Sequence, residues 1–326
     1  MTKLRRPDRI HLPGWASAIS GLALAALVSG CASLQPTRPR VHADAAPARP
    51  TEVLPTDPLS PDLAAYYTRI ESDRVANRLM RTDAGAGEPS MTASRLAETY
   101  LAVALREEHM RGPLGFRGGA DSVLRRWQTP VVYALEFGAT VGRAQRTQDR
   151  QQVAQLANRL ATASDHSISL APAGSNQGNF YVLVLSETER RRAGPRLRAL
   201  IPGIDDAAVR LITEMPRETF CMVMAFSRDG SAVYSEAVAV IRAEHPDLTR
   251  LACYHEELTQ GLGLASDSDA ARPSIFNDDQ EFALLTDHDL LLLRMHYDPR
   301  LTPGMSISQA RPIIFSIASE LVPGET

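Results

Sequence analysis

Lysine is nearly missing from this sequence. Lys3 is the only one in a chain of 326 residues. A P-loop enzyme needs a lysine amine to reach nucleotide phosphates, and a Schiff-base enzyme needs one to react with a carbonyl group. The sequence also has no glycine-rich phosphate loop and no G-x-S-x-G nucleophile elbow. These absences exclude a nucleotide as partner, lysine-based covalent catalysis, and hydrolases built on that elbow.

An excess of positive charge is missing as well. The formal net charge is −3, and the first nine residues contribute +3, from one lysine and three arginines against one aspartate. The rest of the chain therefore carries about −6 (−3 − 3), which argues against nucleic acid as a partner. Hydrophobic residues make up 44% and charged residues 22% of the chain, as in an ordinary soluble globular protein.

The first thirty residues have the pattern of a secretory signal. A basic start precedes an apolar run, Ala16–Val28, which the small residues Ser29 and Gly30 follow. The run is shorter than the roughly 20 apolar residues that a membrane-spanning helix requires. We therefore predict that residues 1–30 are a signal peptide.

The end of this signal, Leu27-Val28-Ser29-Gly30-Cys31, resembles the lipobox of bacterial lipoproteins. The resemblance implies that Cys31 is acylated and that a lipid anchor attaches the mature protein to a membrane. Several acyl chains on one residue anchor a protein stably, whereas a single chain is marginal. Because Ala32, and not aspartate, follows the cysteine, the resemblance points to the outer membrane of a bacterial cell envelope, facing the periplasm. The alternative is an ordinary secretory signal with an incidental cysteine.

Cysteine is scarce, with three in the whole chain. If Cys31 carries lipid, Cys221 and Cys253 remain. Export places them in an oxidising compartment, where a remaining pair tends to bond. We predict a disulfide between them, the alternative being two buried free thiols, and we expect neither to act as a catalytic thiol.

Composition divides the rest of the chain into a tether and a domain. Residues 31–59 are rich in proline and alanine without apolar periodicity, which is typical of a semi-extended linker. Residues 60–326 alternate helical and strand patterns and predict one α+β domain that begins with helices at Ser60-Pro61 and contains an insertion at about 187–216. We expect strands at 131–137, 168–170, 180–185, 220–226 and 232–241. We expect further helices at 92–110, 146–163, 187–215 (two helices), 246–262 and 287–297.

The most informative segment is Leu251–Asp267, which reads LACYHEELTQGLGLASD. A zinc-protease helix of the H-E-x-x-H type needs two histidines four residues apart on one face. Starting that template at His255 puts Thr259 at the second ligand position, and a hydroxyl is a poor zinc ligand. His255 also lies on the stripe of leucines that faces the core. We therefore expect His255 to be a hydrogen-bonded core residue.

A template that starts one residue later fits better. The run EELTQGLGL, which begins at Glu256, resembles the metzincin pattern HELxHxLGL. The resemblance places Glu257 at the catalytic base and Gly263 at the turn glycine. The three positions that hold histidines in metzincins are occupied here by Glu256, Gln260 and Ser266.

Segments nearer the C-terminus extend the resemblance. Ser274-Ile275-Phe276-Asn277-Asp278 is similar to the metzincin Met-turn, with phenylalanine in place of methionine, and Leu285–Tyr297 is similar to the last metzincin helix. The stretch Leu96–Pro312 also resembles domain-of-unknown-function family 2927, which is grouped with zincin-like peptidases. The resemblance implies a mixed, twisted sheet of about five strands with an active-site-type helix and a C-terminal helix, preceded by N-terminal helices. It carries no established activity.

The residues at the histidine positions favour a different metal chemistry. Glu256, Gln260 and Asp267 are the candidate metal ligands, and their oxygen atoms suit calcium, magnesium or manganese better than zinc. Glu257 is the candidate general base if a metal-bound water is activated there. The loop acids Asp269, Asp278 and Asp279 could supply further oxygen atoms. The alternative is that these acids are solvated and bind no metal, as is usual in such a loop. We expect His288 and His296, eight residues apart, to lie at the surface, the alternative being that they approach the cleft.

The hypothesis that these patterns favour is an envelope lipoprotein with a metzincin-like fold that binds peptide or another envelope component without catalysis. A metzincin cleft receives an extended peptide against an edge strand, and this mode of binding needs backbone hydrogen bonds but no metal. The alternative is an active hydrolase with an unconventional metal site that uses Glu257 as base. A purely structural envelope protein is a third possibility.

Overall fold

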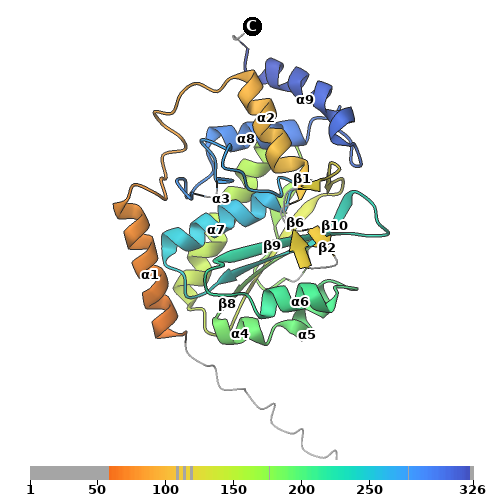
Figure 1. Ribbon diagram of the computed structural model, residues 1–326. Coiled ribbons are helices and arrows are strands. Elements are labelled where there is room, and N and C mark those ends of the chain that lie inside the picture. The colour runs from red at the N-terminus through yellow and green to blue at the C-terminus, as the bar shows by residue number, and fades with distance from the viewer. Residues whose placement is uncertain are drawn as a thin grey trace, which may run out of the picture. The chain divides into compact units, whose positions relative to one another are not determined.

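A mixed β-sheet of six strands is the centre of the computed structural model (Figure 1). The structure describes residues 59–107, 110–112, 115–117, 120–175, 177–277 and 279–323. The strands of the sheet are β5 (Arg126–Trp127), β6 (Val131–Phe137), β7 (Ile168–Leu170), β8 (Phe180–Leu185), β9 (Cys221–Ser227) and β10 (Val233–Arg242). The mixed sheet of about five strands is therefore confirmed, with the two-residue strand β5 in addition.

Strand β9 forms an edge of this sheet. The strands β10, β8, β6 and β7 lie in that order and run parallel. The short strand β5 pairs parallel with the start of β10, and β9 pairs antiparallel with β10. Ala237 of β10 pairs with Phe180 of β8 and also with Ala225 of β9, so β9 lies on the side of β10 away from β8. Among the described residues, β9 has no strand on its other side.

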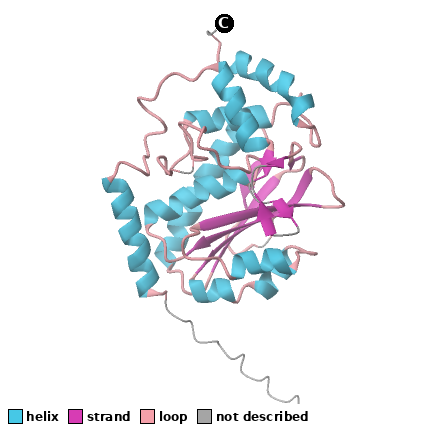
Figure 2. Ribbon diagram, viewed as in Figure 1, coloured by secondary structure: helices cyan, strands magenta, loops and turns pink. Residues whose placement is uncertain are grey.

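Helices cover both faces of the sheet, as Figure 2 shows. They are α1 (Pro61–Ala76), α2 (Ala93–Ala104), α3 (Arg143–Ser164), α4 (Glu187–Arg191), α5 (Gly194–Leu200), α6 (Asp206–Thr213), α7 (Asp247–Gln260), α8 (Asp287–His296) and α9 (Ile307–Leu321). Alternate side chains of β10 separate the two faces, as the pleat requires. Ala237, Ala239 and Ile241 join the larger core beneath α2, α3, α7, α8 and α9. Val238 and Val240 join a smaller core beneath α5 and α6.

The element order matches the prediction closely. From β6 to α7, apart from the insertion, the chain runs strand, helix, strand, strand, strand, strand, helix. All five predicted strands are confirmed to within one residue at each end. The predicted start at Ser60 is confirmed too, because the Ser60 hydroxyl accepts a hydrogen bond from the backbone N–H of Leu63 (3.4 Å).

Three helix predictions need correction. The helix expected at 92–110 ends at Ala104, because the following residues pair as β1 (Arg106–Glu107) with β4 (Ala120–Asp121). The insertion forms three helices, α4 to α6, instead of two. The final helix, α9, was not predicted, and it contains Pro312 in its interior, a residue that normally breaks a helical pattern.

Residues 1–58 lie outside the described residues, and with them the predicted signal peptide, Cys31 and nearly all of the 31–59 tether. The described residues belong to one unit, Val53–Thr326. Among them, no helix has the length and apolar character needed to cross a membrane.

Candidate functional site

Helix α7 carries the predicted site residues, and charged side chains hold its first turns in place. Its N-cap residue, Pro246, provides no side-chain cap. A carboxylate from α1 takes that role, because Glu71 Oε2 accepts hydrogen bonds from both the N–H and the hydroxyl of Thr249 (2.7 Å each). Arg250 then forms a buried ion pair with Asp149 of α3 (2.9 Å). The N-terminal helices therefore help to position the site helix.

His255 is a core residue, as predicted. It is buried, and its Nδ1 accepts a hydrogen bond from the backbone N–H of Leu285 (3.0 Å). Burial lowers its pKa to about 3, with a smaller contribution from the positive charge of Arg159. Thr259, the second ligand position in that frame, is also buried, and its hydroxyl donates to the carbonyl of His255 (2.6 Å). Neither residue is available to a metal.

The C-terminal end of α7 is fastened by three aromatic side chains. Helix ends leave carbonyl groups without intrahelical partners. Here Tyr133 donates a hydrogen bond to the carbonyl of Leu258, Trp127 to that of Gly261 and Tyr297 to that of Leu262, at 3.1, 2.9 and 3.0 Å. These contacts come from β6, β5 and the end of α8, and we did not predict them from the sequence. They fix the direction in which α7 passes into the following turn.

Gly263 makes this turn possible. Its φ is +127°, and a Cβ atom there would lie 2.1 Å from His296 Nε2 and 2.5 Å from the carbonyl oxygen of Arg125. We expect Gly263→Ala to lower the free energy of unfolding by about 2 kcal/mol from backbone strain and crowding. Urea denaturation of the oxidised protein measures this loss. Gly142→Ala is the control, because a Cβ at Gly142 meets nothing within 4 Å, and an equal loss in both variants would contradict the assignment.

A cleft runs along the edge strand β9, between α7 on one side and α6 on the other. Its volume is about 600 Å³. The residues of β9 line it throughout, together with Asp205, Ala208 and Leu211 beside α6. Four residues proposed from the sequence also line it: Glu256, Glu257, Gln260 and Asp267. The structure therefore brings the candidate base and the three candidate ligands together in one cavity.

The third metzincin position, Ser266, faces away from this cavity. It is buried, and its hydroxyl donates a hydrogen bond to the carbonyl oxygen of Arg106 (2.7 Å). Gln260 donates its amide to a carboxylate oxygen of Asp267 (2.7 Å). The positions that hold three histidines in metzincins thus provide one carboxylate, one hydrogen-bonded amide and no third ligand. These residues do not fit the zinc site that the resemblance implies.

The other loop acids do not contribute to the cleft. Asp269 and Asp279 are exposed and do not line it. Asp279 lies 4.0 Å from Arg272 in a loose ion pair. Asp278 lies outside the described residues.

The predicted disulfide is confirmed and lies at the cleft. Cys221, at the start of β9, bonds to Cys253 of α7, with Cα atoms 5.9 Å apart. The Cys221 sulfur and one carboxylate oxygen from each of Glu256 and Glu257 all lie within 4.8 Å of one another. This is the one group of three such side chains with that spacing among the described residues. Cys221 was assigned from the sequence to the disulfide alone, and its place beside the two glutamates was not predicted.

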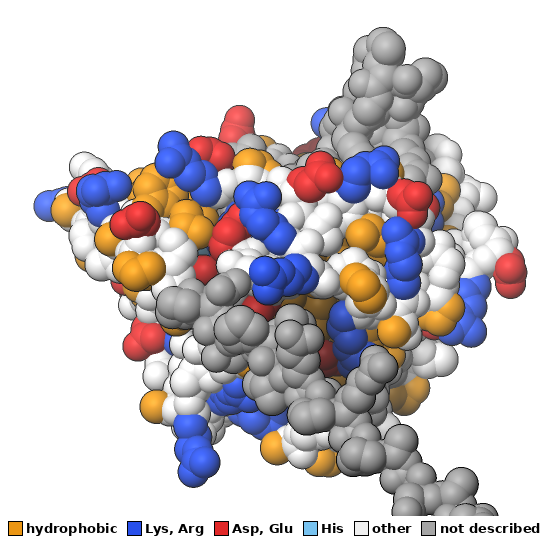
Figure 3. Space-filling view, turned by 90° about the horizontal axis from the view of Figure 1, so that it is seen from below, with side chains coloured by type: hydrophobic (Ala, Val, Ile, Leu, Met, Phe, Trp, Pro, Cys, Tyr) orange, Lys and Arg blue, Asp and Glu red, His pale blue; other side chains and the backbone are white. Residues whose placement is uncertain are grey.

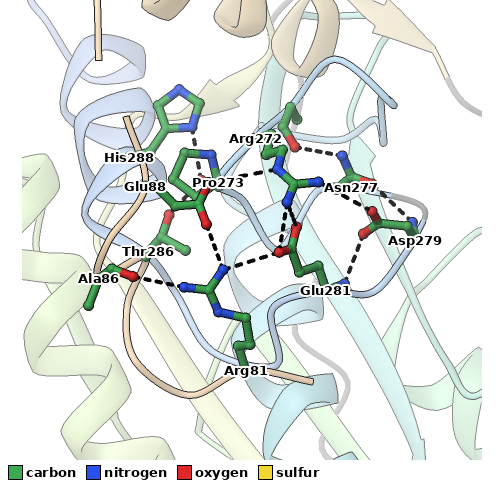
Figure 4. A network of polar contacts seen from close by, with 12 residues as sticks. Arg81, Ala86, Glu88, Arg272, Pro273, Asn277, Asp279, Glu281, Thr286 and His288 are labelled. Carbon is green, nitrogen blue, oxygen red and sulfur yellow. Dashed lines mark hydrogen bonds and ion pairs between the residues drawn. The ribbon is translucent and has the colours of Figure 1, made fainter. Parts of the chain in front are cut away.

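The segment similar to a Met-turn is part of the larger core. Phe276 is fully buried, and the Asn277 amide donates to the carbonyl oxygens of Ala271 (2.9 Å) and Asp269 (3.2 Å). An ion-pair network next to it joins Arg81 to Glu88 and Glu281 (Figure 4), at 2.6 and 3.1 Å. This network links the segment after the site helix to the connection between α1 and α2.

His288 and His296 are buried, which corrects the expectation that they lie at the surface. His288 Nδ1 donates to the carbonyl of Pro273 (3.0 Å; Figure 4). His296 Nε2 donates to the carbonyl of Arg125 (3.0 Å), and its Nδ1 accepts from the Tyr100 hydroxyl (2.9 Å). Helix α8 contacts both α2 and α3, and His296 packs against Tyr100 of α2. Neither histidine lines the cleft.

Two other surfaces are weaker candidates for a functional site than the cleft. A larger hollow of about 1040 Å³ lies between α3 and α8, but it contains none of the predicted site residues. Figure 3 shows the molecule from below, where arginines and acids are interspersed. Arg196, Arg198 and Arg217 form ion pairs with Glu136, Asp206 and Glu218. The cleft beside β9 is therefore the candidate site.

Comparison with known proteins agrees with part of this picture. A family described as "Protein of unknown function (DUF2927)" matches residues 93–316, which is more than half of the chain. The chain belongs to that family. The matched range of DUF2927 includes the whole six-stranded sheet, α7 and all the residues that line the cleft. No curated protein and no solved structure matches the chain.

Proposed function

We propose that this DUF2927 protein is a lipid-anchored protein of the bacterial cell envelope whose metzincin-like domain binds an extended peptide without catalysing its hydrolysis. The observation that carries the proposal is the edge strand β9, which lines the cleft along its whole length and pairs with one strand only among the described residues. An exposed strand edge offers a row of backbone N–H and C=O groups to a bound peptide.

The walls of the cleft support binding of side chains on both sides of such a peptide. Alternate residues of β9 point to opposite faces of the sheet. Val223 and Ala225 pack toward the α7 side, and Met222, Met224 and Phe226 toward the α6 side. The cleft therefore combines polar groups of α7 with apolar groups of β9, which is the usual composition of a ligand site.

The geometry favours binding over metal-dependent hydrolysis. Ser266 is turned away, and Gln260 is engaged by Asp267, so the metzincin positions lack a three-ligand site for an ion that would activate water. The hydrolase with Glu257 as base remains the competing proposal. Glu257→Gln separates the two, because it would abolish peptide hydrolysis and would change peptide affinity little.

Changes to the backbone of the peptide ligand test directly whether the cleft recognises that backbone. We expect extended peptides of about eight residues, the length of an ordinary strand, to bind the oxidised protein. Methylating the backbone nitrogens at alternate positions should weaken binding by about tenfold or more in one register, because it removes edge hydrogen bonds, and should have little effect in the other register. Fluorescence anisotropy with the two methylated series measures this. Equal losses in both series would contradict pairing with an edge strand.

Lipidation has a separate test. We expect the full-length chain, produced in a bacterium with lipoprotein processing, to incorporate labelled palmitate and to fractionate with membranes. Cys31→Ser should abolish the label and release the protein, since its other cysteines are bonded to each other. Mass spectrometry of the mature N-terminus gives the modified residue. A labelled Cys31→Ser variant would refute the anchor while leaving peptide binding untouched.

A further inference from the structure

We propose that reduction of the Cys221–Cys253 disulfide creates a zinc-type metal site in the cleft, formed by Cys221, Glu256 and Glu257. The three ligand-type atoms come from two elements, β9 and α7, and already lie within 4.8 Å of one another. Bonds of about 2.3 Å from zinc to sulfur and 2.0–2.2 Å to oxygen allow ligand atoms to lie up to about 4.5 Å apart around one ion. Small side-chain rotations therefore suffice.

The state of Cys221 decides which cation the group can hold. In the disulfide its sulfur is not a thiolate, and two neighbouring carboxylates alone make a weak, hard site. Reduction adds a soft thiolate ligand, which selects zinc over magnesium or calcium. Only Glu256 occupies a histidine position of the metzincin pattern, and Gln260 and Ser266 take no part. The site is therefore a different one from the zinc site that the resemblance implies.

The chemistry balances with a dithiol as reductant. The dithiol is oxidised to its own disulfide, and the Cys221–Cys253 bond is converted into two thiols. Zinc then displaces the proton of the Cys221 thiol to solvent and forms a sulfur–zinc bond. A thiolate beside two carboxylates is electrostatically unfavourable until a cation neutralises it. Zinc should therefore favour the reduced state, by about tenfold for each tenfold rise in zinc above its dissociation constant.

The positions of the two cysteines allow both the dithiol and the metal to reach the site. Cys221 is only partly buried and lines the open cleft, whereas Cys253 is buried within α7. A dithiol can thus attack at the Cys221 side. Metal bound there would neutralise most of the negative charge of its three ligands, beside the edge strand. Peptide binding by the oxidised, metal-free protein is a separate measurement, so either proposal can fail without the other.

A matched pair of variants tests the site. Cys253→Ser and Cys221→Ser both remove the disulfide, but only the first leaves a thiol beside the two glutamates. We expect Cys253→Ser to bind one equivalent of Zn²⁺ at least about 100-fold more tightly than Cys221→Ser. With Co²⁺ as probe, Cys253→Ser alone should show a thiolate-to-cobalt charge-transfer band. Equal affinities, or cobalt binding without that band, would overturn the proposal.

Two further measurements guard against misfolding and nonspecific charge effects. Full-length wild-type protein, reduced with a phosphine that does not bind zinc, should gain the site that the oxidised protein lacks. In the Cys253→Ser background, Glu257→Gln should weaken Zn²⁺ binding by about tenfold or more. Asp269→Asn, which neutralises an exposed acid outside the cleft, should leave it unchanged. Equal effects of the two substitutions would also overturn the proposal.

Discussion

Replacing Glu187 by glutamine is expected to lower the free energy of unfolding by about 3–5 kcal/mol, the cost of breaking a buried ion pair from one side. Glu187 is the shared counter-ion of two fully buried arginines, at 2.7 Å from Arg190 and 2.5 Å from Arg242. Burial alone would raise the pKa of Glu187, but hydrogen bonds and attraction from these arginines outweigh it and hold the pKa below its usual range. Without that charge, both guanidinium groups lose their anionic partner.

The loss of stability caused by Glu187→Gln should extend to the candidate site. Arg242 also donates hydrogen bonds to the carbonyl oxygens of Met215, Pro216 and Thr219, which lead directly into β9. Weaker contacts of Arg242 should therefore make the segment 215–219, which precedes the edge strand, more mobile. Hydrogen exchange of the β9 amides should then be faster.

Urea denaturation at neutral pH measures the global effect of Glu187→Gln. Glu214→Gln is the matched control, because Glu214 is an exposed acid in the same inserted segment, and a surface change of this kind should stay within about 0.5 kcal/mol. A Glu187→Gln variant as stable as the control would show that the arginines do not depend on this carboxylate.

The protein is also expected to lose stability steeply as the pH falls below about 6.5, the ordinary pKa of histidine. Burial lowers the pKa of His245, His255 and His296 to about 3, and that of His288 to about 4. Below pH 6.5 the unfolded chain binds protons at these histidines and the folded chain does not. Each of them should therefore cost about 2 kcal/mol of stability at pH 5 relative to pH 7.

Buried acids act in the opposite direction and reduce this loss. Burial raises the pKa of Asp289 to about 6, so the folded state takes up a proton there before the unfolded state does. Burial likewise raises the pKa of Asp149 and Glu244. Four histidines outweigh these acids at pH 5, because the pKa of each histidine is displaced by more than two units.

The slope of stability against pH tests this account. Removing one histidine should reduce the slope between pH 6 and pH 5 by about 1.4 kcal/mol per pH unit, the value for one proton. His288→Leu suits this test, since His288 Nε2 is buried without a hydrogen-bond partner among the described residues. The ring signals of these four histidines in NMR spectra provide the check, because they should not titrate in the folded protein above pH 5. If the signal of any of the four titrated near pH 6.5, the prediction would be contradicted.

Periodicity along the chain predicted most of the sheet. The run from Val131 to Phe137 and that from Phe180 to Leu185 were predicted with the bounds that the structure shows, because each consists mainly of apolar residues that favour strands. Errors occurred where tertiary contacts override local preference. The helix expected to reach residue 110 stops at Ala104, since Arg106 pairs with Asp121 and accepts a hydrogen bond from Ser266. Neither partner is near in sequence.

The candidate site was partly predictable for the same reason. Glu256 and Gln260 lie four residues apart on one helix, so their spacing alone indicates a common face. The role of His255 in the core followed from its place in the leucine stripe.

In contrast, the burial of His288 and His296 depends on contacts outside helix α8. The Tyr100 hydroxyl and the carbonyl of Arg125 bond to His296, and the carbonyl of Pro273 bonds to His288. No pattern within residues 285–297 indicates how many sides of that helix are covered.

By itself the sequence determined what this protein cannot use, namely a catalytic lysine or a phosphate loop, and which helix face carries its acids. It also identified the two cysteines that bond. Only the tertiary structure decided that β9 is an edge strand, that Ser266 turns away from the cleft and that Cys221 lies beside Glu256 and Glu257. The physical reason is that periodicity records which side of an element is buried. It does not record which distant segment packs there, and the chemistry of this cleft depends on such contacts.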